Sequence, residues 1–134
     1  MNKSDDDMIA QAREEFASGR VLALREATGH TRAELAAEVG VSVPSWVRWE
    51  RGETGLRSRN ALAVARILER LHAEDVLRVE HLRLTVLARI DALLAAPGVV
   101  AAPEPAITEW KAGIARQDAE GLQRVLDSLR DDAP

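Results

Sequence analysis

The chain has 134 residues, a formal net charge of −4, and 46% hydrophobic and 30% charged positions, which suits one compact domain or a small domain with a helical appendage. It has no cysteine, which excludes disulfides and thiolate metal sites and favours a reducing, cytoplasmic setting. No apolar run approaches the ~18 residues that span a bilayer, and the acidic start lacks the apolar core of a signal peptide. Because 23 Ala and 16 Leu dominate and aromatic residues are scarce, we expect an all-α protein.

Two helices are expected before residue 30. The first begins near Asp7, and residues 1–18 are assigned to an N-terminal helical extension. The second covers 21–27 and should end at Gly29, because glycine adopts the left-handed conformation that closes many helices.

Two short helices follow, separated by a tight turn. Thr31 and Glu34 have the spacing of a capping box, which predicts the start of a third helix that ends at Gly40. Ser42 is expected to cap a fourth helix that runs to about Arg51. A small residue at Ala36 lets the second of these helices cross closely over the first, so the pair has helix-turn-helix geometry.

The remainder of the chain is also expected to be helical. A fifth helix is predicted over 60–71 and a long amphipathic one within 72–96, with the joint at 72–75 left open as either a break or a continuous helix. Prolines and a glycine predict an extended connector over 97–105. Residues 106–134 are expected to form a C-terminal helical segment in which Asp118 caps a helix.

The stretch from Thr31 to Gly52 resembles the Cro/repressor type of helix-turn-helix domain, the XRE family. The resemblance covers about residues 19–71 and rests on Leu24-Arg25-Glu26, Thr31-Arg32-Ala33-Glu34-Leu35-Ala36, Gly40-Val41-Ser42 and Trp49-Glu50-Arg51-Gly52. It implies a five-helix repressor-like DNA-binding domain with additional C-terminal helices, in which the fourth helix enters the major groove of double-stranded operator DNA.

The resemblance also implies roles for individual residues. It pairs Glu50 with Arg25 as a structural ion pair and places Trp46 and Trp49 in the core. Residues implied to contact bases are Ser42, Val43, Pro44, Val47 and Arg48. Residues expected to contact phosphates are Thr31, Arg32, Ser45, Arg51, Arg57 and Arg59.

The sequence departs from many relatives at Val43 and Pro44, where amide side chains are common. Neither residue hydrogen-bonds a base edge through its side chain, although both can pack on thymine methyl groups, and Arg48 can form a bidentate pair with guanine. Charge agrees with a DNA contact in this region, because nine Arg and six Glu give residues 19–71 a net charge of +3 between two acidic flanks.

An apolar stripe in the long helix has two interpretations. It covers the core of the DNA-binding domain, or it buries against a second copy in a homodimer. The dimerisation candidates are Val79, Leu82, Val86, Ile90 and Leu93. The acidic C-terminal segment favours dimerisation or a protein partner over DNA contact.

No nucleophile elbow, phosphate-cradling loop or catalytic carboxylate pair is present, so neither an enzyme nor a cofactor is expected. The three histidines lack metal-ligand spacing and are expected to be plain surface residues. The favoured function is a sequence-specific DNA-binding transcriptional regulator, most simply a repressor of phage, prophage or bacterial origin. The alternatives are an antitoxin that represses its own operon and a helical interaction module without DNA binding.

Overall fold

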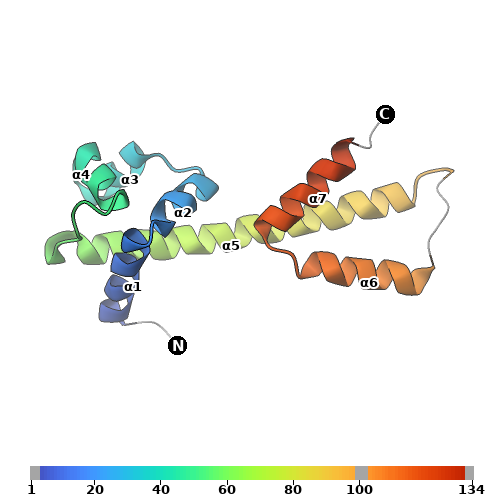
Figure 1. The fold of residues 1–134 in the computed structure, drawn as a ribbon, viewed down its shortest axis with the longest axis horizontal. Coiled ribbons are helices and arrows are strands. Elements are labelled where there is room, and N and C mark those ends of the chain that lie inside the picture. Colours follow the sequence, from blue (N-terminus) through green and yellow to red (C-terminus); the bar gives the residue numbers. More distant parts are fainter. Residues whose placement is uncertain (1–3, 99–102, 132–134) are drawn as a thin grey trace. The chain divides into compact units, whose positions relative to one another are not determined.

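The computed structural model describes residues 4–98 and 103–131, and this part of the chain contains seven helices and no strand (Figure 1). The helices are α1 (Asp5–Ala17), α2 (Arg20–Thr28), α3 (Arg32–Val39), α4 (Val43–Glu50), α5 (Ser58–Leu94), α6 (Glu104–Ala115) and α7 (Ala119–Asp131). The all-α prediction with additional C-terminal helices is confirmed. The chain forms two compact units, which divide between Val76 and Leu77.

Local capping signals set the ends of the short helices. The Thr31 hydroxyl accepts the Glu34 N–H at 3.1 Å, and the Glu34 carboxylate accepts the Thr31 N–H at 3.3 Å, which is the expected capping box. Gly40 ends α3 with a φ of 86°, in the left-handed region that favours glycine. The Ser42 hydroxyl then accepts the Ser45 N–H at 3.2 Å and begins α4.

Helix α5 is one helix of 37 residues, which decides between the two alternatives that the sequence left open for the joint at 72–75. The joint at 72–75 is continuous, because it contains neither the glycine nor the proline that would end a helix. At the predicted connector, Glu104 and Pro105 already belong to the first turn of α6, where a missing proline N–H costs little. Residues 99–102 of that connector lie outside the described residues.

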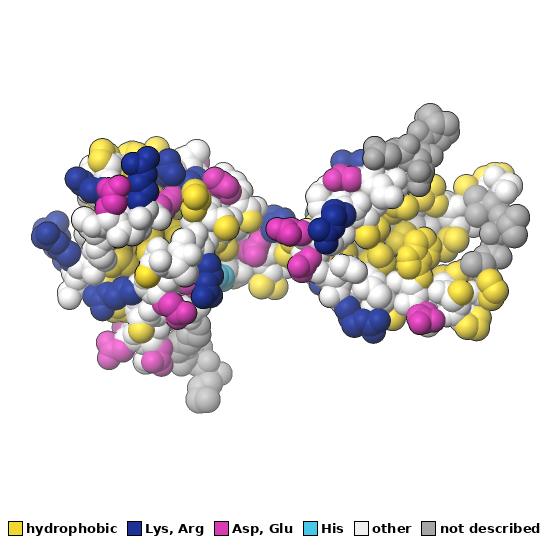
Figure 2. Space-filling view, viewed as in Figure 1, with side chains coloured by type: hydrophobic (Ala, Val, Ile, Leu, Met, Phe, Trp, Pro, Cys, Tyr) yellow, Lys and Arg dark blue, Asp and Glu magenta, His cyan; other side chains and the backbone are white. Residues whose placement is uncertain are grey.

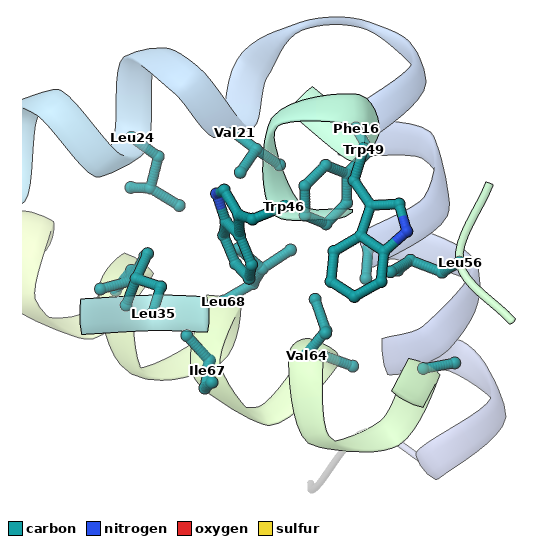
Figure 3. Packing of buried hydrophobic residues seen from close by; sticks show 14 of the residues in the cluster. Phe16, Val21, Leu24, Leu35, Trp46, Trp49, Leu56, Val64, Ile67 and Leu68 are labelled. Carbon is teal, nitrogen blue, oxygen red and sulfur yellow. The ribbon is translucent and has the colours of Figure 1, made fainter. Parts of the chain in front are cut away.

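Three aromatic rings form the centre of the first unit (Figure 3). Phe16, Trp46 and Trp49 pack edge to face, with ring centroids 5.6 to 6.3 Å apart. Aliphatic side chains from α2, α3 and α5 surround them; these include Val21, Leu24, Leu35, Val64, Ile67 and Leu68. Because Phe16 comes from α1, the helix assigned to an N-terminal extension contributes directly to this core.

The second unit has a separate apolar core. Val86 and Ile90 of α5 pack with Ile114 of α6 and with Leu122 and Leu126 of α7. The apolar stripe therefore has a partner that neither interpretation named, namely α6 and α7 of the same unit. Among the dimerisation candidates, Val86 and Ile90 are already buried within one chain, and Val79 and Leu82 pack against the same core.

Part of the apolar surface of the second unit stays open, as Figure 2 shows on its visible face. Leu84 and Trp110 are among its exposed large hydrophobic residues. In the part of the chain that the structure describes, no helix combines the length and hydropathy that crossing a membrane requires.

Candidate nucleic-acid interface

The turn between α3 and α4 is held by backbone hydrogen bonds. The N–H groups of Gly40 and Val41 both donate to the Ala36 carbonyl, at 2.9 and 3.0 Å. The Ala36 side chain is itself only 1% exposed, so a larger residue there has no room. This turn fixes the direction in which α4 leaves α3.

The two sides of α4 have different environments. Trp46, Trp49 and Glu50 are buried against the rest of the first unit. On the opposite side, Val43 is 41% exposed, and Pro44 and Arg48 are also exposed. Val47 is half-buried. The expected base-contacting residues of α4 therefore share the outer side of the helix.

Two of the expected DNA-contacting hydroxyls already have partners within the chain. The hydroxyl oxygens of Ser42 and Ser45 are 2.9 Å apart and hydrogen-bonded to each other, while Ser42 also caps α4. Among the residues on the outer side of α4, Arg48 is then the main side chain with free donors for a base edge.

A groove of about 570 Å³ lies beside α4. It is lined by the turn residues 40–42, by Arg48, and by Arg57 and Arg59 at the start of α5, and its lining includes no acidic side chain. Figure 2 shows Lys and Arg side chains gathered over the end of the first unit that holds α4 and the beginning of α5. Three cations that the sequence predicted separately thus meet at one concave surface, which attracts phosphate groups.

The Arg25–Glu50 ion pair is present, and a second arginine joins it. Arg25 Nε lies 2.8 Å from Glu50 Oε1, with side-chain exposures of 10% and 1%. Arg32 Nε lies 3.2 Å from the same oxygen and is 38% exposed. The sequence predicted Arg32 only as a phosphate contact, because residues 32 and 50 carry no local signal that joins them.

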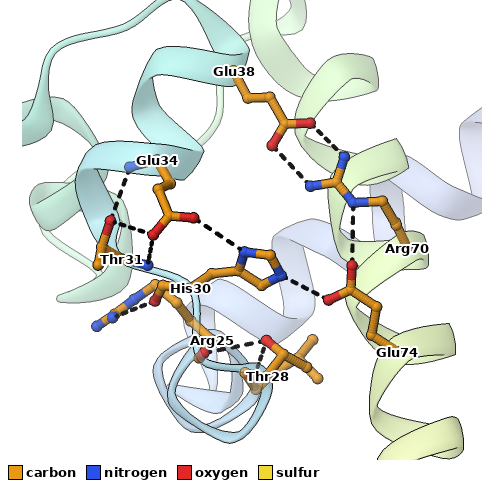
Figure 4. Close-up of polar contacts among 9 residues, drawn as sticks. Arg25, Thr28, His30, Thr31, Glu34, Glu38, Arg70 and Glu74 are labelled. Carbon is orange, nitrogen blue, oxygen red and sulfur yellow. Dashed lines mark hydrogen bonds and ion pairs between the residues drawn. The ribbon is translucent and has the colours of Figure 1, made fainter.

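A further network connects α3 to α5 (Figure 4). Arg70 of α5 makes a bidentate ion pair with Glu38 of α3, and this pair lowers the pKa of the Glu38 carboxyl. His30 Nε2 lies 2.7 Å from a Glu74 oxygen, and the hydrogen bond to Glu74 raises the pKa of the imidazole above its usual value of 6.5. His30 therefore stabilises the contact between the α2–α3 turn and α5 best when it is protonated.

Two histidines expected to be plain surface residues are thus bonded to carboxylates. In addition to His30, His72 of α5 lies 2.8 Å from Glu15 of α1, whose side chain is only 6% exposed. The remaining expected phosphate contacts have local roles as well: Thr31 caps α3, and Arg51 lies 4.0 Å from Glu53.

A family model described as a helix-turn-helix domain matches residues 19–82. Residues 19–82 are a helix-turn-helix domain. The match confirms the helix-turn-helix domain that the sequence predicted and extends further along α5 than the predicted boundary at residue 71. Within this helix-turn-helix domain, α3 and α4 are the two helices of the motif, and α4 occupies the place of the recognition helix. Comparisons with curated proteins and with solved structures found no match.

Proposed function

We propose that this chain is a sequence-specific DNA-binding regulator of transcription that represses by occupying promoter DNA. The observation that supports this most directly is the outer side of α4, exposed next to a groove whose lining holds three arginines and no acidic residue. A helix-turn-helix domain presents its second helix to the major groove, where basic side chains beside that helix meet the flanking phosphates.

The residues divide between base contact and phosphate contact. Arg48 is exposed in the last turn of α4 and can pair with the O6 and N7 acceptors of guanine. Val43 and Pro44, nearer the start of α4, pack against thymine methyl groups. Arg57 and Arg59 hold the flanking phosphates from the groove.

The direct test is binding to the DNA that flanks the protein's own gene, compared with unrelated DNA of the same length. Fluorescence anisotropy at several salt concentrations gives the affinity and its salt slope. We expect tighter binding to the flanking DNA, and an affinity that falls with a log–log slope of about −0.9 per phosphate contacted. Equal affinity for both DNAs contradicts sequence-specific recognition, and no binding to either one favours an interaction module.

Variants of two arginines separate the two kinds of contact. Arg48→Ala should cost about 1–3 kcal/mol and relax discrimination at one base pair. Arg57→Ala should weaken binding to all sequences alike and lower the salt slope by about one. Arg66→Ala is the matched control, because Arg66 is an exposed α5 residue outside the groove lining. Equal losses on every sequence for Arg48→Ala would remove Arg48 from the base contacts.

Purification of the full chain tests the antitoxin alternative in parallel. A small protein that co-purifies in a fixed ratio supports that alternative and assigns the C-terminal segment to a protein partner. A well-folded chain that purifies alone supports the regulator without a toxin.

A further inference from the structure

Helix α6 of the second unit has one side anchored in its own fold and another side that is open. Ile114 is 5% exposed in the core, and the Lys111 ammonium pairs with Asp91 of α5. On the open side lies a shallow groove of about 490 Å³, to which Val125 of α7 also contributes. The lining residues of α6 recur every three or four positions, so they share one side of the helix.

Trp110 is the largest exposed side chain of this groove. It is 48% exposed, and the surface that it leaves in water is a favourable contact for another protein. Tryptophan is the residue type that most often supplies binding energy at the centre of protein interfaces.

Gly113 lies one turn further along α6, and none of the described residues packs closely enough against it to require glycine. Glycine inside a helix costs about 1 kcal/mol relative to alanine. A Cβ built on Gly113 meets nothing within 4 Å, so the packing of the unit itself does not require glycine there. The open space in front of Gly113 instead leaves room for an aromatic side chain of another protein molecule to pack closely there, next to the exposed Trp110.

Two opposite charges flank this pair of residues. Glu109 and Arg116 both line the groove and stand seven positions apart, about 10 Å along the helix. In residues 4–98 and 103–131, neither side chain makes a hydrogen bond or an ion pair. When two copies of such a helix lie antiparallel, the acidic side chain of each copy faces the basic side chain of the other. The surface is therefore complementary in charge to a second copy of itself.

We infer that this side of α6 binds a second copy of the chain, with the two α6 helices antiparallel across a two-fold axis between Ala112 and Gly113. Each Glu109 then faces Arg116 of the second copy. Each Trp110 packs into the space in front of Gly113 of the second copy. Such an interface is isologous, which is the commonest form of protein dimer. The inference is independent of DNA binding, because it uses residues of the second unit alone.

Charge reversal in the full chain tests this interface. The mass of the particle is measured by sedimentation equilibrium over a range of concentrations. Glu109→Arg and Arg116→Glu should each weaken the dimer by about tenfold or more, because the symmetry places every change in the interface twice. Trp110→Ser should weaken it as well. Arg124→Glu, an exposed reversal on α7 outside the groove lining, is the matched control and should leave the dimer intact.

The decisive measurement mixes the two single variants. The Glu109→Arg chain has two positive side chains on this side of α6, and the Arg116→Glu chain has two negative ones. An equimolar mixture of the two should therefore form a heterodimer with the affinity of the wild-type dimer. The double variant Glu109→Arg, Arg116→Glu should also dimerise. A wild-type chain that is monomeric at every concentration overturns the inference, as does a dimer that none of these reversals weakens or a mixture that fails to associate.

Discussion

The most informative single substitution in the first unit is Glu50→Ala, because one carboxylate holds two arginines from two other segments. Arg25 belongs to α2, Arg32 begins α3, and Glu50 ends α4. Removing the carboxylate leaves two guanidinium groups without their shared partner. The substitution therefore acts on the contacts that hold α4 against the rest of the first unit.

The expected cost follows from burial. The Glu50 and Arg25 side chains are 1% and 10% exposed, and removal of one partner of a buried pair costs about 3–5 kcal/mol. Arg32 is 38% exposed and can turn to water, so Arg32→Ala should cost about 1 kcal/mol or less. Arg25→Ala should fall between these values, because Glu50 then keeps Arg32 as a partner.

Urea unfolding followed by tryptophan fluorescence measures these differences. Trp46 and Trp49 are buried in the first unit, and a Trp110→Phe background removes the only other indole in the chain. The emission shift then reports the first unit alone. Circular dichroism of each variant before urea is added verifies that it is folded.

A double variant supplies the control. Replacing both members of the pair, Arg25→Met with Glu50→Leu, removes the stranded charge and should recover most of the stability that Glu50→Ala loses. The reasoning fails if Arg32→Ala costs as much as Glu50→Ala. It fails equally if the apolar double variant is less stable than Glu50→Ala.

Three further predictions concern other parts of the chain. Phe16→Ala should cost about 3–5 kcal/mol in urea unfolding, because it removes the ring that contacts both buried tryptophans; a loss under about 1 kcal/mol would mean that α1 is dispensable for the core. The pKa of His30 is raised above 6.5, so its contribution is fully present below pH 6.5 and is lost as pH rises through the folded-state value. His30→Gln should flatten this part of the stability-against-pH curve, and an unchanged curve would exclude His30 as its source. Val86→Asp should reduce the helical signal of the second unit while Trp46 and Trp49 emission stays native, and unchanged circular dichroism would contradict the burial of Val86.

The features that the sequence predicted well are those with local signals. The Thr31–Glu34 capping box, Gly40 at the end of α3 and Ser42 at the start of α4 depend on residues within four positions of one another. Such contacts form in the same way in almost any tertiary setting, which is why their spacing is enough to predict them.

The features that the sequence did not predict join residues distant along the chain. His30 and Glu74 are 44 positions apart, and Arg32 and Glu50 are 18 apart. Each of these side chains had a plausible alternative in water or on a phosphate, and only the packing of the helices selects the partner. The apolar stripe of α5 was recognised, but periodicity indicates that a surface is buried without naming what covers it.

If α4 enters the major groove as proposed, the mutual hydrogen bond of Ser42 and Ser45 affects which base pairs the helix distinguishes. That hydrogen bond uses one of the two O–H donors, so the first turn of α4 offers mainly the hydrocarbon of Val43 and Pro44 beside one remaining hydroxyl donor. Hydrocarbon side chains pack against the 5-methyl group of a pyrimidine and form no hydrogen bonds with the donors and acceptors beside it. Cytosine that a methyltransferase has modified at C5 presents that same methyl group. Methylation of a binding site should therefore change the affinity of this helix for DNA about as much as a change of base does.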